Sequence, residues 1–173
     1  MLSRVNRLRV AVLLLLVAGC ATVFPTIDQR TTQGPTADEL WTVRVMQQTG
    51  RQPSFEEKRH FETEMDDRIG RYLREHQDAA SSLSVMSFRS LRQVTVGMDK
   101  EQVEILLGPP LTATRDAAQM QSLARHHWPE IRDNAKPDEA WTYPFGWVVY
   151  FSNSRVADLT QYLPRMSPSG RPA

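Results

Sequence analysis

The stretch VTVGMDKEQVEILLGPP, residues 94–110, is the most organised short segment of this 173-residue chain. Two glycines bracket a helical pattern, and two prolines follow it. Asp99 can accept a hydrogen bond from a first-turn amide, and Gln102 can reach back to the amide of Asp99, which together form a capping box. Gly108 suits the left-handed position after the last turn, and the prolines cannot continue a helix. The stretch therefore predicts a helix of about ten residues with a defined start and end.

The same stretch places apolar side chains at helical spacing. Val103, Leu106 and Leu107 stand at positions i, i+3 and i+4, so they line one helix face, which we expect to lie on a sheet. A phosphate-binding loop would instead need four residues between its glycines, and then Lys and Ser or Thr at the start of a helix. Here ten residues separate Gly97 from Gly108, and the helix lies between them. The pattern disfavours a phosphate site.

Downstream of this helix the pattern changes from helical spacing to alternation. LTATR, residues 111–115, has the composition of a short strand. Three further segments, separated by Gly146 and by a Ser-Asn-Ser turn, have strand composition: EAWTYPF at 139–145, WVVYF at 147–151 and RVADLTQY at 155–162. Such segments predict a three-stranded antiparallel meander. Because helices precede it, the expected fold class is α+β, with helices packed on the sheet.

Two capping patterns upstream predict two more helices. Thr36 with Glu39 opens the first, for which helix is favoured over strand although the following residues also alternate. Ser54 with Glu57 opens the second, an amphipathic helix over residues 54–78. Its polar face mixes acidic and basic side chains, which favours packing on the rest of the protein over lying on a membrane surface. We expect its apolar stripe to contain Phe55, Phe61, Met65, Ile69, Leu73 and His76, with Tyr72 beside it.

The N-terminal segment 1–19 has a positive start, a short apolar run and small residues at its end, which is the pattern of a secretory signal peptide. The residues Val-Ala-Gly-Cys at 17–20 resemble the bacterial lipobox, in which cleavage before the cysteine leaves a lipid-modified N-terminal residue. Cys20 is the only cysteine, so no internal disulfide is possible. We expect a covalent lipid on Cys20 to anchor the protein, since each buried acyl methylene contributes about 0.8 kcal/mol. An ordinary signal peptide with Cys20 there by chance is the open alternative.

The charge of the mature chain indicates no nucleic-acid partner. Removal of residues 1–19 takes away three of the 21 basic residues and none of the 20 acidic ones, which leaves a net charge of −2. A nucleic-acid-binding surface needs basic residues concentrated on one face, and the sequence has no such concentration.

The mature chain divides further by composition. Residues 20–35, which include Pro25, Gly34 and Pro35, have the composition of a flexible tether behind the lipidated Cys20. The remaining segments are an N-terminal helical extension at 36–93, of which 79–93 has no clean period, a domain at 94–162 with an insertion at 116–138 that allows one helix before Pro129, and a disordered tail at 163–173.

Several spaced residues together resemble a known family. Gly97-Met98-Asp99-Lys100-Glu101-Gln102-Val103, Leu107-Gly108-x-Pro110, Trp141-x-Tyr143 and a strand ending in Phe151 are similar to the pattern of the SmpA/OmlA family, the BamE-like outer-membrane lipoproteins. The resemblance covers about residues 91–162, and the lipobox agrees with it. The residues that carry the structural motif are Gly97, Met98, Asp99, Gln102, Val103, Leu107, Gly108 and Pro110.

The resemblance implies two helices on a three-stranded antiparallel sheet, the ααβββ layout, in a lipoprotein on the periplasmic side of the outer membrane. Ala21, where an acidic residue would indicate another destination, agrees with the outer membrane. It further implies a non-enzymatic adaptor that binds outer-membrane assembly complex proteins and supports β-barrel assembly and envelope integrity. The alternative is a stand-alone envelope lipoprotein that binds or inhibits another periplasmic protein. The extension 36–93 and the insertion 116–138 depart from the family pattern.

The chemistry-bearing residues do not form a catalytic pattern. The neighbouring His126 and His127 lack the i, i+4 spacing of a zinc pair, and no serine lies in a G-x-S-x-G frame. The acidic pairs at 56–57 and 66–67 are adjacent residues on a helix face and do not converge. We therefore expect no enzyme activity, no metal, no cofactor beyond the lipid on Cys20, and no small-molecule substrate.

The candidate interaction site is an aromatic group: Trp141, Tyr143, Phe145 and Trp147. These rings either bind a partner or pack the helices onto the sheet, and alternation places the first three on one face. Val148 and Tyr150 point to the opposite face, so that face needs another cover. The helix at 54–78 and a partner protein are the two candidates.

Overall fold

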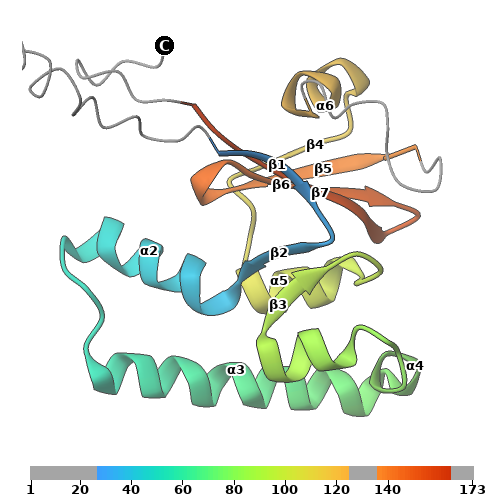
Figure 1. Cartoon of the computed structure of the whole chain (residues 1–173). Coiled ribbons are helices and arrows are strands. Elements are labelled where there is room, and N and C mark those ends of the chain that lie inside the picture. Colours follow the sequence, from blue (N-terminus) through green and yellow to red (C-terminus); the bar gives the residue numbers. More distant parts are fainter. Residues whose placement is uncertain (1–26, 125–135, 165–173) are drawn as a thin grey trace, which may run out of the picture. The chain divides into compact units, whose positions relative to one another are not determined.

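The computed structural model describes residues 27–124 and 136–164 of the chain. Cys20, the signal segment 1–19 and the histidines His126 and His127 lie outside the described residues, as do the tail residues 165–173. Residues Ile27–Leu163 belong to one unit, whose helices and strands are labelled in Figure 1.

The capping residues of the opening stretch form the predicted helix. Helix α5 spans Lys100–Leu107 and Asp99 is its N-cap. Asp99 Oδ1 accepts from the Gln102 amide at 2.9 Å and Gln102 Oε1 accepts from the Asp99 amide at 3.0 Å, so the capping box is confirmed. Gly108 follows the helix with φ 69° and ψ −168°. Its positive φ was expected, but the left-handed helical position is wrong, because this φ, ψ pair lies in a region that essentially only glycine enters.

Five antiparallel strands of the described residues form the main sheet, in the order β1-β7-β6-β5-β4 (Figure 1). They are β1 (Ile27–Thr31), β4 (Thr112–Thr114), β5 (Glu139–Tyr143), β6 (Trp147–Ser152) and β7 (Arg155–Leu163). The predicted meander is confirmed as β5-β6-β7, and the short strand LTATR is confirmed as β4. The sheet is wider than the three strands expected, because β4 and β1 pair along its two edges. The α+β class is confirmed.

The tether expected at 20–35 is wrong for residues 27–35, which form strands. β1 pairs with β7, and β2 (Gln33–Thr36) pairs with β3 (Gln93–Thr95) in a separate two-stranded sheet. The polar composition of this segment hid the strands, because their partners lie far along the chain and no local alternation marks them.

Side-chain contacts also hold β1 in the sheet. Arg30 Nε donates to Asp158 Oδ2 at 2.6 Å, and the Asp158 side chain is only 3% exposed. Gln29 Nε2 donates to Gln161 Oε1 at 2.8 Å. Both contacts cross from β1 to β7, so the first strand is fixed by charge and amide pairing in addition to its main-chain bonds.

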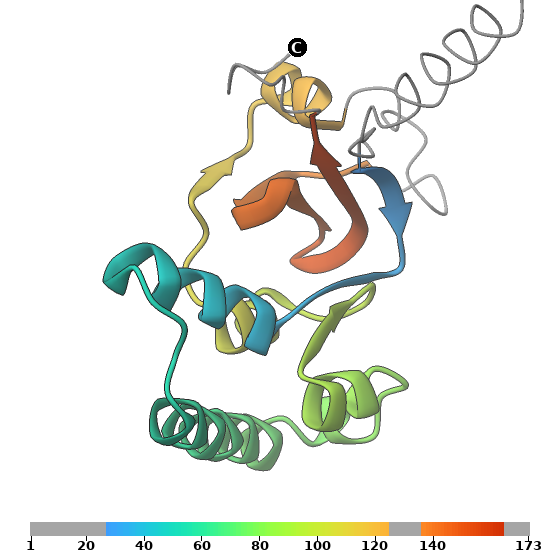
Figure 2. The same cartoon turned by 60° about the vertical axis from the view of Figure 1, so that its left-hand side comes forward.

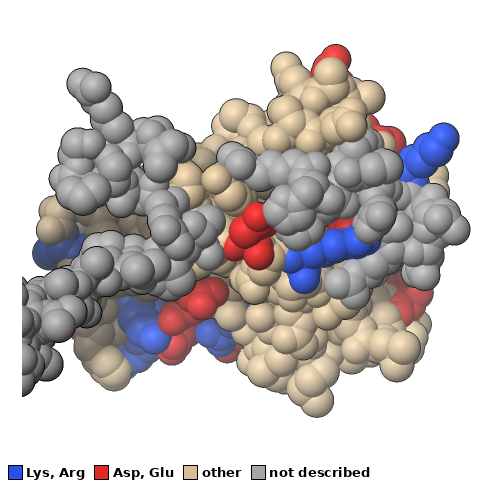
Figure 3. Space-filling model, turned by 45° about the horizontal axis from the view of Figure 1, so that its top comes forward, with Lys and Arg blue, Asp and Glu red and all other residues tan. Residues whose placement is uncertain are grey.

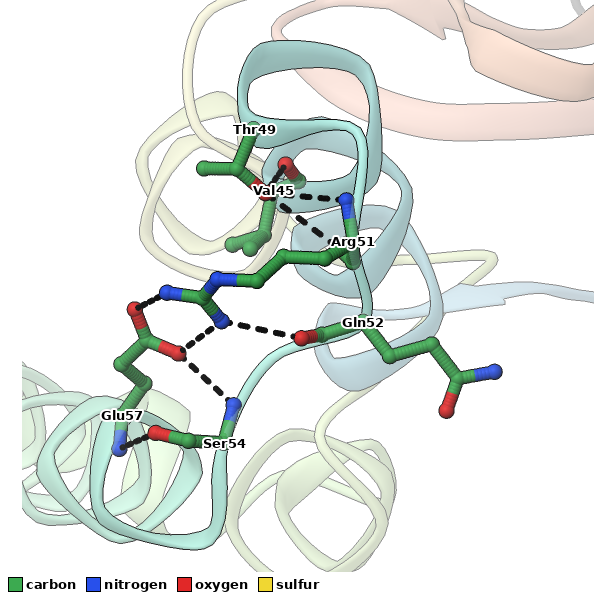
Figure 4. Close-up of polar contacts among 6 residues, drawn as sticks. All are labelled: Val45, Thr49, Arg51, Gln52, Ser54 and Glu57. Carbon is green, nitrogen blue, oxygen red and sulfur yellow. Dashed lines mark hydrogen bonds and ion pairs between the residues drawn. The ribbon is translucent and has the colours of Figure 1, made fainter.

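Helices α2 (Ala37–Thr49) and α3 (Phe55–Glu75) each begin with the predicted capping box. Figure 4 shows the corner between them, where Arg51 donates to both carboxylate oxygens of Glu57 at 2.8 Å. Glu57 also accepts from the Ser54 amide at 2.7 Å. The hydrogen bonds from Arg51 and Ser54 lower the pKa of Glu57 to about 2. The corner is therefore held by an ionised carboxylate that serves the cap and the ion pair together.

The apolar stripe of α3 is buried at Met65 and Ile69, and Tyr72 beside it is buried too. Phe55 is 77% exposed, so its assignment to the buried stripe is wrong. It occupies the first helical position, at the corner with α2.

Residues 79–93, which lack a clean period, contain a π-helical turn. The helix α4 spans Gln77–Ala80, and the turn η1 spans Ser87–Leu91. The Arg92 amide donates to the carbonyl of Ser87, five residues back, which is the hydrogen bond of a π-helix. Side chains on such a turn follow neither the helical nor the strand period, which explains the ambiguity.

The two faces of the main sheet have separate covers. Helices α2, α3 and α5 lie on one side of the sheet, and α6 (Ala117–Ala124) lies on the other (Figure 2). Met120 and Ala124 of α6 pack on Ala140, Val148 and Tyr150. The helix at 54–78, one of the two candidates for this cover, does not supply it, because α3 lies on the other side of the sheet (Figure 1) and packs with α5. The segment expected as an insertion supplies the cover instead.

The segments 36–93 and 94–162, expected to be separate, do not pack as separate units. Leu40, Tyr72 and Phe88 from the first segment share one buried cluster with Val103 and Val149 from the second. The extension is thus part of the core that holds the sheet.

Candidate interaction surface

The structure divides the aromatic candidate group between core and surface. Tyr143 is 2% exposed, and its hydroxyl donates to the Gly108 carbonyl at 3.1 Å. Trp141 is buried and its ring meets Phe151 edge to face, with centroids 4.6 Å apart. Trp147 is partly buried against the same cluster. Trp141 and Tyr143 therefore pack the helices onto the sheet and are not available as a binding surface, whereas Trp147 keeps part of its surface exposed.

Phe145 is the most exposed member of the group. It does not share a face with Trp141 and Tyr143, as alternation suggested, because β5 ends at Tyr143 and Phe145 lies in a turn. This turn, Pro144–Gly146, is called the PFG turn below. Phe145 is 48% exposed, with φ 60° and ψ 28°.

The PFG turn is held tightly although its backbone is unfavourable. A left-handed conformation costs an L-residue about 1–2 kcal/mol, and for a bulky side chain it is a genuine outlier. Gln161 Nε2 donates to the Phe145 carbonyl at 3.2 Å. Gly146 follows with φ 71°, and a Cβ on it would lie 1.8 Å from the Tyr162 carbonyl oxygen, so only glycine fits. The packing of the turn on β7 imposes the strain and holds the Phe145 ring half exposed.

The turn lies at the end of the sheet where β1 begins. Tyr162 pairs with Asp28, and Leu163 pairs with Ile27, the first described residue. Ile27 is itself partly exposed. The exposed phenylalanine therefore belongs to the sheet end at which the chain from Cys20 enters the fold.

The motif residues of the opening stretch make structural contacts. Met98 is fully buried, and its carbonyl accepts from the Val156 amide at 2.7 Å. The Gly97 carbonyl accepts from Arg155 Nη1 at 3.1 Å. These bonds join the start of α5 to β7, so the motif fastens a helix to the sheet.

Asp99 also receives a bond from α3, which the sequence did not indicate. The hydroxyl of Tyr72 donates to Asp99 Oδ2. Burial of the Tyr72 hydroxyl, followed by this hydrogen bond, raises the pKa of Tyr72. The tyrosine thus stays protonated and acts as a donor that joins α3 to the N-cap of α5. The Tyr72 ring also stacks on the His76 ring, with the two ring centroids 4.2 Å apart.

A buried carboxylate near the start of β5 is the other group that sequence analysis missed. Glu139 Oε2 accepts from Lys100 Nζ and from Arg115 Nε, each at 2.8 Å, and Oε1 accepts from Trp141 Nε1 at 2.5 Å. Burial would raise the pKa of Glu139, but the hydrogen bonds from Lys100, Trp141 and Arg115 outweigh burial and lower it to about 2. Lys100 also lies 5.3 Å from the centre of the Phe151 ring. The three donors keep the Glu139 carboxylate ionised, and the bond from Lys100 joins α5 to the sheet. This is a structural role rather than that of a general base.

Charges on the α6 side of the unit are mixed. On the face seen in Figure 3, the acidic and basic side chains of the described residues are interspersed rather than gathered into a field of one sign.

Residues 27–124 and 136–164 contain no helix long and apolar enough to cross a membrane. In the same residues, no three His, Cys, Asp or Glu side chains come together in a way that suits a metal ion.

Comparison of the chain with protein-family models, with curated proteins and with solved structures gave no match.

Proposed function

We propose that the chain is a lipoprotein anchored through Cys20 to the outer membrane, with its folded unit on the periplasmic side, and that it acts by binding proteins. The observation that carries this proposal is the PFG turn. A strained backbone holds a half-exposed phenylalanine where asparagine or glycine would cost less. Folding alone does not account for that residue, whereas a contact with a partner does.

The length of chain between anchor and fold supports the same function. Only residues 21–26 separate Cys20 from β1. Because an extended chain spans at most about 3.6 Å per residue, the sheet end that carries Ile27 would stay within about 25 Å of the lipid anchor. A unit held so close to the membrane suits partners that are themselves in or on that membrane.

The resemblance to the SmpA/OmlA family suggests which partners these are. In this proposal α5 and the strands β5–β7 belong to the family's ααβββ layout, and the unit docks on outer-membrane assembly complex proteins. The adaptor would stabilise that complex and so support β-barrel assembly and envelope integrity.

Co-purification tests the proposal. The tagged chain, extracted in mild detergent, is expected to bring barrel-assembly components with it, and Phe145→Asn is expected to lose them. Relief of about 1–2 kcal/mol of backbone strain offsets about 1 kcal/mol lost with the half-buried ring, so the variant remains folded. Recovery of the same components by Phe145→Asn would remove the turn from the proposal, and recovery of none by the parent chain would refute the adaptor function.

Fractionation tests the anchor separately. Cys20→Ala is expected to leave the membrane fraction, because the acyl chains are its attachment. A Cys20→Ala variant that stays with the membrane to the same extent as the parent would show that the anchor assignment is wrong.

A stand-alone envelope lipoprotein that binds or inhibits one periplasmic protein is the second candidate. The segment 36–93 favours it, because this segment lies outside the family-like pattern and contributes two long capped helices to the fold. Deletion of the chain distinguishes the two candidates. General detergent sensitivity with lower barrel-protein levels supports the adaptor, and a narrow phenotype supports the single-partner protein.

A further inference from the structure

Gly70 lies in the interior of α3, a position at which glycine destabilises a helix relative to alanine. The backbone does not require it, since Gly70 is not among the residues with positive φ. Crowding does not require it either. Apart from its own helix backbone and chain neighbours, a Cβ on Gly70 would meet within 4 Å only Arg74 Nη1, at 3.4 Å, among the described residues. A Cβ there would make ordinary van der Waals contact with the Arg74 guanidinium, and beyond that contact the missing side chain leaves space.

That space is part of a groove between α3 and the π-helical turn η1, which we call the α3 groove. Its volume is about 570 Å³. The residues that line it are Asp66, Ile69, Gly70, Leu73, Arg74, Arg89 and Ser90. The five from α3 follow the i, i+3, i+4, i+7, i+8 spacing of one helix face. At 1.5 Å per residue this face extends for about 12 Å, which suits a few residues of extended peptide or two turns of a helix.

The floor and the rim of the groove differ in chemistry. Gly70 and Leu73, both partly exposed, give the floor an apolar surface, and the buried Ile69 lies beneath them. Arg74 and Arg89 lie at the rim, and neither makes an ion pair with another described residue. Asp66 is already paired, since its Oδ1 accepts from Arg92 Nη2 at 2.8 Å. The groove therefore offers two guanidinium groups beside an apolar floor.

We propose that the α3 groove binds a short peptide segment of a partner protein, in which a large apolar side chain stands next to carboxylates. The apolar side chain would lie over Gly70, and the carboxylates would accept from Arg74 and Arg89. The inference adds the chemistry of a partner to the proposed adaptor function, and rests on that function for its biological role.

A peptide fits this surface better than an anionic membrane does. The exposed residues of α3 include Glu64 and Asp67 as well as arginines. A membrane-binding helix would present mostly Lys and Arg on its polar face. The acidic residues would repel an anionic lipid surface, whereas a peptide can place its carboxylates at the two arginines alone.

Two variants separate binding from stability. Gly70→Leu fills the groove and replaces a poor helix former by a good one, so Tm is expected to rise by about 3 °C. Arg74→Glu combined with Arg89→Glu reverses the charge of the rim. Arg71→Glu, on the same helix but outside the groove lining, is the control for one charge reversal on α3.

The test is a fluorescence-anisotropy titration of the full chain, purified in nonionic detergent, with two labelled peptides. One peptide carries leucines between glutamates, and the other carries leucines between lysines. The acidic peptide is expected to bind at least tenfold more tightly than the basic one. Its affinity should fall at least tenfold in Gly70→Leu and in the double reversal, and should change less than twofold in Arg71→Glu.

Three results would overturn the inference: no saturable binding of the acidic peptide, equal affinity for both peptides, or an affinity that Gly70→Leu leaves unchanged. Binding of anionic phospholipid vesicles in place of the peptide would also overturn it. The titration needs neither the lipid anchor nor an assembly partner. Its failure is therefore distinguishable from failure of the fractionation and co-purification experiments.

Discussion

Gly108→Ala is expected to lower the free energy of unfolding by about 2–4 kcal/mol, most of it from two sources at one position. The first is the backbone. With φ 69° and ψ −168°, Gly108 occupies a region that other residues enter at a cost of about 1–3 kcal/mol. The second is a clash. A Cβ on Gly108 would lie 2.6 Å from Arg44 Nη1, so the guanidinium has to move.

Movement of Arg44 breaks a bond that joins α2 to the end of α5. Arg44 Nη2 donates to the Pro109 carbonyl at 3.1 Å, and such an exposed hydrogen bond contributes about 0.5–1 kcal/mol. A shift of the chain at Gly108 would also disturb its carbonyl, which accepts from the Tyr143 hydroxyl. The helix end, the neighbouring helix and the sheet meet at this glycine.

Gly50→Ala is the matched control. Gly50 also has positive φ, at 71°, but lies in the ordinary left-handed region with nothing within 4 Å of its Cβ position. Its replacement should cost about 1 kcal/mol. Urea unfolding followed by circular dichroism gives both values. In an Arg44→Ala background the cost of Gly108→Ala should fall by about 0.5–1 kcal/mol, the part that the arginine contributes. A Gly108→Ala cost no larger than that of Gly50→Ala would refute the reasoning.

Three further perturbations test other contacts. Glu139→Gln should lower the free energy of unfolding at neutral pH by about 1–3 kcal/mol. Because the folded pKa of Glu139 is about 2 and its ordinary value is 4.5, the stability it adds is present above pH 4.5 and lost as pH falls toward 2. Urea titrations at several pH values should show the parent and Glu139→Gln converging in that window, and parallel curves would contradict the assignment. Tyr72→Phe, which removes the donor to Asp99, should cost about 1 kcal/mol by thermal unfolding, whereas no loss would show that the bond is not needed. Phe145→Asn should change the free energy of unfolding by less than about 1 kcal/mol, since relieved strain and lost burial nearly cancel, and a larger loss would show that the ring serves the fold.

Features governed by neighbours in sequence were predictable. The three capping boxes at Thr36, Ser54 and Asp99 each depend on residues three positions apart, and all three form. The meander β5-β6-β7 follows from alternation and short turns. These assignments depend on hydrogen bonds between residues close in sequence and on the periodicity of apolar residues. A single sequence contains both kinds of information.

Features governed by distant contacts were not predictable. Strand β1 has a polar sequence and exists because β7 pairs with it, through contacts such as Arg30 with Asp158. The π-helical bond of η1 follows neither period. Glu139 gains its three donors from α5, from the segment after β4 and from β5 itself, which only the folded chain brings together.

The candidate site also combines a feature that the sequence predicts with features that only the folded chain shows. Phe145 was named from the sequence, but its exposure depends on a turn whose backbone angles no period predicts. In the sequence Gly70 is recognisable only as a residue that destabilises its helix, and the groove that it lines forms where η1 packs beside α3. Natural sequences agree with local preferences at most positions, and departures concentrate where function requires them. Both residues lie at surface positions where an ordinary substitution, alanine or asparagine, would preserve or raise stability. The capping boxes, the Glu139 cluster and the core on both faces of the sheet supply stability elsewhere in the unit, so the fold can retain two residues that are locally unfavourable. If both positions serve binding, as proposed, they are the positions where stability and binding should change in opposite directions or independently.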